Sequence, residues 1–168
     1  MATVYYQFLP SPVGPFLVAG TDEALHYTGF KLGRQQLKRE ASWVEDAAPL
    51  AYAIEPLQAY FNGETIEFDL PLNLHGTAFQ RSVWAALQTI PYGQTVSYGD
   101  IARMIDQPGA SRAVGMANNA NPIPIIVPCH RVIGADGSLT GFGGGLPAKT
   151  KLLQMESANT IGGQPSLF

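Results

Sequence analysis

Residues 121–132 read Asn-Pro-Ile-Pro-Ile-Ile-Val-Pro-Cys-His-Arg-Val and hold the only cysteine of the chain, Cys129. Prolines at positions 122, 124 and 128 fix the backbone φ angle and remove hydrogen-bond donors, which excludes a helix and a regular strand ladder. We therefore predict an extended apolar segment that holds Cys129 and His130 in one place. A lone cysteine is most simply a small buried apolar side chain. The neighbouring imidazole makes a nucleophile the competing interpretation.

A thiol becomes a good nucleophile only when a base removes its proton. His130 follows Cys129 directly, and adjacent side chains of an extended chain point to opposite sides. A water bridge between thiol and imidazole is therefore easier than direct contact. The imidazole needs a carboxylate to orient it. Glu156, at the end of a helix predicted over 148–157, is the best candidate, and the alternative is a solvated acid at a helix end.

The composition is that of a globular protein that fits one core or two small lobes. Of the 168 residues, 46% are hydrophobic and 14% are charged, and the net charge is −3. The N-terminus resembles no secretory signal, no apolar run is long enough to span a membrane, and one cysteine forms no intramolecular disulfide. We therefore expect a cytoplasmic protein, nucleoid-associated if bacterial.

Charge is distributed unevenly along the chain. Four basic and nine acidic residues lie in 1–80, whereas six basic and four acidic residues lie in 81–168. The mildly basic second half is the part that can approach phosphates, with modest and salt-sensitive affinity. Chance partition of a few charges explains the same counts.

The first lobe is predicted to combine a small antiparallel sheet with one helix. Apolar runs over 4–9, 15–19 and 24–30 are separated by Pro, Gly and Asp and indicate strands. Residues 49–61 have helical spacing, and Asn62-Gly63 ends that helix. Residues 66–72 form a connector. We place the boundary near residue 76, which gives an α/β domain over 1–76 and a mainly helical domain over 77–168.

The second lobe has clear helix starts. Thr77 is a candidate cap for one helix, and Ser97-Tyr98-Gly99-Asp100 is a capping-box pattern for the next. Pro108-Gly109 ends that helix, and 111–118 begins another. Two helices joined by such a turn indicate a DNA-binding helix-turn-helix, although helical hairpins are also common in cores.

The second helix of this pair offers one long cation, Arg112, among small side chains. Small residues allow close approach where width is limiting, as in the minor groove, and Arg112 is long enough to occupy the place of a removed base. In the alternative, Ala113, Gly115 and Ala117 pack against the first helix and Arg112 is solvated. Both hold together if Ala113 and Ala117 share a face that excludes Arg112.

Other chemistries have little support in the sequence. One cysteine and three scattered histidines provide no ligand pairs at zinc spacing, so we expect no metal. The glycine-rich run over 141–145 lacks the features of a phosphate loop. It is predicted to be a turning loop beside the thiol, with Phe142 as an apolar wall, or a simple linker. His26 and His75 are predicted to be structural.

Several motifs of the chain resemble the O6-alkylguanine-DNA alkyltransferases, single-use DNA-repair proteins. The resemblance spans nearly the whole chain and is densest at these segments: Phe79-Gln80-Arg81-Ser82-Val83-Trp84, Ile90 to Tyr98, Arg112-Ala113-Val114-Gly115, and Pro128-Cys129-His130-Arg131-Val132. It implies a small α/β lobe followed by a helical lobe with a winged-helix-like helix-turn-helix. It further implies a monomer that binds double-stranded DNA by the minor groove and flips the damaged base out of the stack.

The resemblance also implies roles for individual residues. Cys129, His130 and Glu156 match the family's nucleophile, water-bridged base and orienting acid. The thiolate takes the alkyl group from O6-alkylguanine, and O4-alkylthymine is a further expected substrate. The resulting thioether is not released, so each molecule acts once and needs no cofactor. Tyr98 matches a tyrosine that extrudes the nucleotide and protonates guanine N3, and Asn121 matches the asparagine that holds the turn before the cysteine.

DNA contacts and the base pocket follow from the same resemblance. Arg112 would fill the gap left by the flipped base, with Tyr98, Ala113 and Gly115 on the DNA-binding surface. The apolar pocket around the base and its alkyl group would be formed by Pro124, Val127, Ala135, Phe142 and Gly143. Phe142 replaces a tyrosine of some members, and glycines at 143–145 predict tolerance of alkyl groups larger than methyl. With one cysteine, the structural zinc site of some animal members cannot form.

Three other functions compete with alkyl transfer. A non-catalytic alkyl-lesion-binding protein is disfavoured because such proteins typically carry tryptophan where this chain has Cys129. A helix-turn-helix regulator is disfavoured by the small side chains of the recognition helix. A cysteine hydrolase is disfavoured because nucleophile and base are adjacent and no oxyanion donor pattern is evident.

Overall fold

The computed structural model describes residues 2–30, 40–139 and 145–159. Its first lobe contains a four-stranded sheet in the order β3-β2-β1-β4. The strands are β1 (Tyr5–Leu9), β2 (Phe16–Gly20), β3 (Leu25–Phe30) and β4 (Val44–Glu45). The first three pair antiparallel, as expected, but β4 is an unpredicted strand that pairs parallel to β1, so the sheet is mixed. Two exposed residues were too short a signal to find in the sequence.

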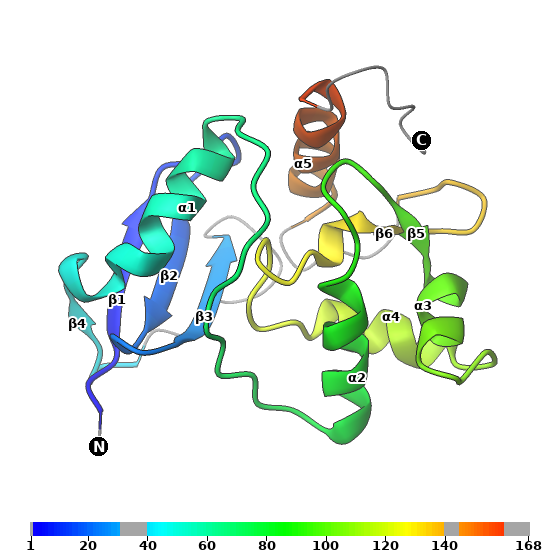
Figure 1. Cartoon of the computed structure of the whole chain (residues 1–168), viewed down its shortest axis with the longest axis horizontal. Coiled ribbons are helices and arrows are strands. Elements are labelled where there is room, and N and C mark those ends of the chain that lie inside the picture. The colour runs from blue at the N-terminus through cyan, green and yellow to red at the C-terminus, as the bar shows by residue number, and fades with distance from the viewer. Residues whose placement is uncertain (1, 31–39, 140–144, 160–168) are drawn as a thin grey trace.

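One helix covers this sheet (Figure 1). A 3₁₀ turn (Ala48–Leu50) leads into α1 (Ala51–Phe61), close to the predicted helix. The ring of Phe61 packs against Phe16 of β2 at 5.3 Å between centroids, which anchors α1 to the sheet. Gly63 has a φ of +92° and ends the helix, because that left-handed conformation suits glycine.

The second lobe is mainly helical, as predicted. It contains α2 (Ala78–Leu87), β5 (Val96–Ser97), α3 (Tyr98–Met104), α4 (Ser111–Asn119), a 3₁₀ turn (Cys129–Arg131), β6 (Val132–Ile133) and α5 (Leu146–Ala158). Ser97 forms the predicted capping box with Asp100, and the predicted cap Thr77 also forms a capping box, with Gln80. Helices α2, α3 and α4 pack together, and β5 pairs parallel to β6 (Figure 1).

The segment before the cysteine is folded back on itself, so the expectation of an extended chain is wrong. Ile125 has a φ of +78°, and the amide of Val127 donates to the carbonyl of Ile123 (3.0 Å). Pro128, with φ −81° and ψ 66°, forms an inverse γ-turn that lets the Cys129 amide donate to Val127 (2.8 Å). Proline excludes helices and ladders but permits turns.

The first lobe holds this folded segment in place. The amide of Thr28 in β3 donates to the carbonyl of Pro122 (3.0 Å), and its hydroxyl donates to that of Pro124 (2.9 Å). Thr28 is fully buried, so both bonds form away from water, where unpaired carbonyls are costly. The buried apolar residues of both lobes form one cluster that includes Cys129. The segment that leads to Cys129 is therefore bound directly to the first lobe.

Candidate active site around Cys129

Cys129 begins the 3₁₀ turn and is 4% exposed. Its carbonyl accepts a hydrogen bond from the buried Asn118 amide of α4 (3.3 Å). Asn121 closes the preceding loop, because its amide nitrogen donates to Val127 (2.8 Å) and its oxygen accepts from the Ile123 amide (2.9 Å). These bonds determine where the thiol lies relative to α4.

The environment of the thiol disfavours its ionisation. Burial raises the pKa of the Cys129 thiol to about 11, although the Asn121 amide and the charge of Lys149 act in the opposite direction. Placing a thiolate in apolar surroundings costs free energy, and the interactions with Asn121 and Lys149 do not fully offset that cost. The resting cysteine is therefore a protonated thiol at neutral pH, and its activation requires a base.

His130 is fully buried and oriented by Glu156. The ring Nε2 lies 2.5 Å from Glu156 Oε2. Since a carboxylate only accepts hydrogen bonds, this contact assigns the proton to Nε2 and leaves Nδ1 as an acceptor. Nδ1 has no hydrogen-bond partner among the described residues. Burial lowers the pKa of His130 despite the nearby carboxylate, so the imidazole is neutral and available as a base.

Glu156 is buried rather than solvated at the end of α5. Its oxygens accept hydrogen bonds from the side chains of Tyr60 (2.5 Å), His130 (2.5 Å) and Arg131 (2.8 and 3.1 Å) and from the amide of Gly93 (3.2 Å). Burial raises the pKa of this carboxyl, but interactions with His130 and Arg131 outweigh it and hold the pKa well below its usual range. Glu156 is therefore a permanent anion that orients the imidazole.

Three of the side chains in this network were not identified as site residues from the sequence: Tyr60, Arg131 and Lys149. Arg131 belongs to the motif that contains Cys129, which was the available signal. Lys149 donates to the carbonyl of Val132 (2.6 Å), and desolvation lowers its pKa to about 8. Its signal is helical spacing, because Lys149, Leu152, Leu153 and Glu156 are all buried on one face of α5.

The structure places the predicted DNA-binding residues on or beside α4. Arg112 and Ala113 are exposed. Gly115 lies beside Tyr98 of α3, since a Cβ there would be 3.8 Å from the Tyr98 ring. Ala117 is buried whereas Ala113 is exposed, so the alternative in which both alanines pack against the first helix does not hold for Ala113. Side chains four residues apart on an α-helix differ in direction by about 40°. The buried face of α4 includes Val114 and Ala117, and Ala113 lies outside it.

The residues predicted to form the base pocket are not all gathered together. Pro124 and Val127 are buried near the cysteine, whereas Ala135 is exposed. Phe142 and Gly143 lie outside the described residues.

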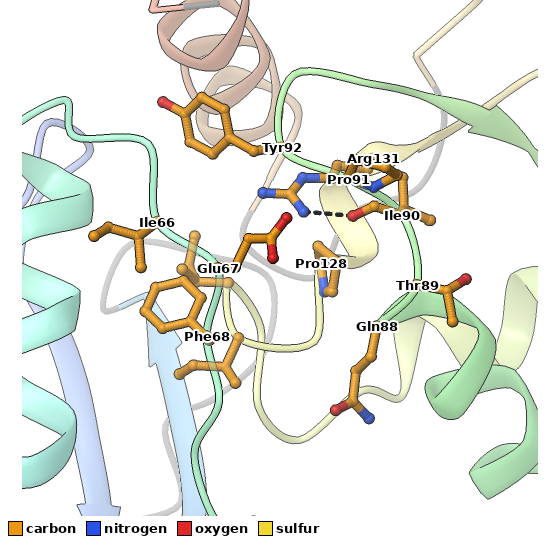
Figure 2. A pocket seen from close by; sticks show the side chains of 12 residues that line it. Ile66, Glu67, Phe68, Gln88, Thr89, Ile90, Pro91, Tyr92, Pro128 and Arg131 are labelled. Atoms are coloured by element: carbon orange, nitrogen blue, oxygen red, sulfur yellow. Dashed lines mark hydrogen bonds between the residues drawn. The ribbon is translucent and has the colours of Figure 1, made fainter.

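A cavity of about 250 Å³ lies on the Arg131 side of the network (Figure 2). Its walls come from the connector (Ile66, Glu67 and Phe68), from the 88–92 segment and from Ile125, Ile126, Pro128 and Arg131. Figure 2 shows the Arg131 guanidinium bound to the carbonyl oxygen of Ile90, at 2.8 Å. Of the residues predicted for the base pocket, the three that the structure describes, Pro124, Val127 and Ala135, do not line this cavity.

Within the described ranges, no helix is long and apolar enough to cross a membrane. In the same part of the chain, no cluster of three or more His, Cys, Asp or Glu side chains could hold a metal ion.

A helical lobe that holds a buried cysteine next in sequence to an imidazole oriented by a carboxylate is the arrangement expected of a protein that uses a cysteine nucleophile. Comparison with known proteins identifies the class. Residues 4–74 match the family model of the 6-O-methylguanine DNA methyltransferase ribonuclease-like domain, and residues 78–158 match that of its DNA binding domain. The chain belongs to the 6-O-methylguanine-DNA methyltransferase family, whose members repair DNA directly by transferring the alkyl group to a cysteine of their own chain.

Individual relatives are similar over nearly their full lengths. The methylated-DNA–protein-cysteine methyltransferase of Methanosarcina acetivorans is 52% identical over 155 residues, which cover 92% of this chain and 99% of the relative. That of Mycolicibacterium paratuberculosis is 53% identical, with 91% and 92% covered. The crystal structure of Mycobacterium tuberculosis OGT in complex with DNA superposes with a TM-score of 0.87 at 50% identity and covers 92% of this chain and 94% of that one. The expected family, the small α/β lobe followed by a helical lobe, and the transferase activity are confirmed.

Proposed function

We propose that this chain repairs O6-alkylguanine, and also O4-alkylthymine, in double-stranded DNA by one irreversible transfer to Cys129. The observation that carries the proposal is the burial of the chain's only cysteine beside a neutral imidazole that is oriented by a permanent carboxylate. We further propose two domains, 1–76 and 77–168, and a monomer that acts in the cytoplasm or on the nucleoid. Neither a cofactor nor a metal takes part in the proposed reaction.

The proposed reaction begins with proton transfer. The Cys129 thiol passes its proton through one water molecule to Nδ1 of His130, and Glu156 stabilises the imidazolium. The thiolate attacks the alkyl carbon, the carbon–O6 bond breaks, and a thioether forms. Tyr98 supplies a proton to N3 of the departing guanine and is reprotonated at the expense of the imidazolium. The thiol proton thus ends on guanine, and Asn121 keeps the loop before the cysteine in place throughout.

The proposed DNA surface is the exposed side of α4. Arg112 enters the minor groove and fills the space of the flipped nucleotide, while Ala113 and Gly115 permit close approach. Tyr98 stands beside Gly115 and assists extrusion. The base and its alkyl group would then contact Pro124, Val127 and Ala135, together with Phe142 and Gly143. Glycines at 143–145 would leave room for alkyl groups larger than methyl.

Intact-protein mass spectrometry tests the proposed function. After incubation with a duplex that contains one O6-methylguanine, we expect a stoichiometric mass gain of one methylene on Cys129. The same duplex with unmodified guanine is the control and should leave the mass unchanged. An unmodified protein that still binds the methylated duplex would instead be a lesion binder.

Arg112→Ala is expected to slow repair of duplex DNA roughly ten- to hundredfold, because the unfilled gap leaves the flipped base less stable by a few kcal/mol at most. Reaction with free O6-benzylguanine should change less than about twofold, since no base is flipped. Arg81→Ala, which removes an exposed arginine of α2, is the matched control. Equal losses on duplex and free base would contradict the proposed role of Arg112.

A further inference from the structure

A side chain of the first lobe reaches into the proton relay. Tyr60 lies near the end of α1 and is fully buried. Its hydroxyl donates to Glu156 Oε2 at 2.5 Å and lies 3.5 Å from Nε2 of His130. Glu156 Oε2 is the same oxygen that accepts the imidazole proton. The hydroxyl and the imidazole therefore compete for the charge of one carboxylate oxygen.

We propose that Tyr60 is a positioning residue for alkyl transfer, whose hydroxyl shares Glu156 Oε2 with His130 and so keeps the imidazole a neutral base with its proton on Nε2. The proposal rests on the function proposed above, in which His130 receives the thiol proton. Through Tyr60, the first lobe would thus contribute to alkyl transfer at Cys129, which belongs to the second lobe.

The physical argument concerns how much the carboxylate stabilises an imidazolium. A hydrogen bond to the charged form of a carboxylate draws on its negative charge and weakens its attraction for a neighbouring cation. Without the Tyr60 hydroxyl, Glu156 Oε2 would carry more of the negative charge and would stabilise the imidazolium form of His130, which is protonated at both Nε2 and Nδ1, more strongly. The pKa of His130 would then rise, and at mildly acidic pH a larger fraction of the imidazole would be protonated and unable to accept the thiol proton.

Other charged and titratable groups lie near His130 and Glu156, and they also influence the pKa of His130. Arg131 and Lys149 disfavour a charged His130, and desolvation does the same. Tyr92 lies at the same cluster and interacts with Glu156, and Cys129 lies close enough to Lys149 to interact with it. The pKa of Tyr60 itself is raised well above its ordinary value, first by burial and then by Glu156, so its hydroxyl remains a donor.

The ring of Tyr60 is fixed independently of its hydroxyl. It packs against Phe61, Phe68 and Tyr92 with centroid distances of 5.6, 5.7 and 6.0 Å. Tyr60→Phe therefore keeps the ring contacts and removes one hydrogen bond. Tyr52→Phe is a matched control on the same helix, because the Tyr52 hydroxyl donates to the carbonyl of Thr21 (2.8 Å), outside the relay.

The test is the pH dependence of benzyl transfer from free O6-benzylguanine to the full-length protein. In Tyr60→Phe we expect the acidic limb to move up by about half a pH unit or more, so that the rate falls about threefold or more well below the midpoint of the limb, while the rate at about pH 8.5 changes less than twofold. Tyr52→Phe should keep the wild-type profile. A merely structural role would lower the rate equally at every pH, and that result would overturn the proposal.

Direct titration of His130 by NMR provides the second readout. The chain has three histidines, so the His130 signal is identified by its loss in His130→Gln. We expect its pKa to rise in Tyr60→Phe and to stay unchanged in Tyr52→Phe. An unchanged His130 titration in Tyr60→Phe overturns the role of Tyr60 alone. If His130→Gln itself transfers benzyl at the wild-type rate, the proposed relay fails, which is a separate outcome.

Discussion

Cys129→Ser is expected to abolish alkyl transfer and to leave binding to alkylated duplex DNA within about twofold of wild type. A serine hydroxyl is far less acidic than a thiol, and the neutral imidazole beside it cannot produce a useful alkoxide. Binding should persist because the backbone at position 129 is held by bonds that serine retains, from its amide to Val127 and from Asn118 to its carbonyl. Intact mass measures the transfer, and fluorescence anisotropy with a labelled duplex measures the binding.

The control for this prediction addresses other sulfur atoms. Met104 of α3 is an exposed sulfur outside the site, and Met104→Leu should transfer the alkyl group at the wild-type rate. A mass gain in Cys129→Ser would show that another atom accepts the alkyl group. If Cys129→Ser loses both DNA binding and alkyl transfer, the buried thiol is needed for the local fold.

The elements that could be predicted from sequence are those determined by local interactions. Thr77 and Ser97 begin helices because each cap bonds to a residue three positions later, and such pairs are visible in the sequence. The segment before Cys129 was mispredicted because its conformation depends on distant partners. Thr28, nearly a hundred residues earlier, binds the carbonyls of Pro122 and Pro124, and no local pattern indicates that contact.

The site was predictable in part for the same reason. Cys129 and His130 were evident from their motif, and Glu156 followed from the resemblance and from the need for a carboxylate. Arg131 and Lys149 were missed because charged residues are usually exposed, and only tertiary structure shows that both are buried. Tyr60 lies within the helix predicted over 49–61, but the partner of its hydroxyl lies in the other lobe, and no local pattern indicates that contact.

Arg131→Met is expected to be the most destabilising of the substitutions considered. It removes the bidentate partner of a fully buried carboxylate, together with a bond to Ile90 and a contact with the Tyr92 ring at 5.6 Å. Loss of one partner of a buried ion pair typically costs about 3–5 kcal/mol, because the other charge stays buried and uncompensated. For a chain of this size the melting temperature should fall by roughly 6–20 °C, measured by differential scanning calorimetry.

Arg103→Met is the matched control, because Arg103 pairs with Asp100 on the surface and its side chain is 63% exposed. Exposed pairs contribute about 0–1 kcal/mol, so its melting temperature should fall by at most about 4 °C. The double variant Arg131→Met with Glu156→Gln should be more stable than Arg131→Met alone, because the uncompensated charge is then absent. If the double variant is instead the less stable of the two, Glu156 is held by Tyr60, His130 and Gly93 strongly enough to remain favourable without Arg131, and the ion pair is not what stabilises the carboxylate.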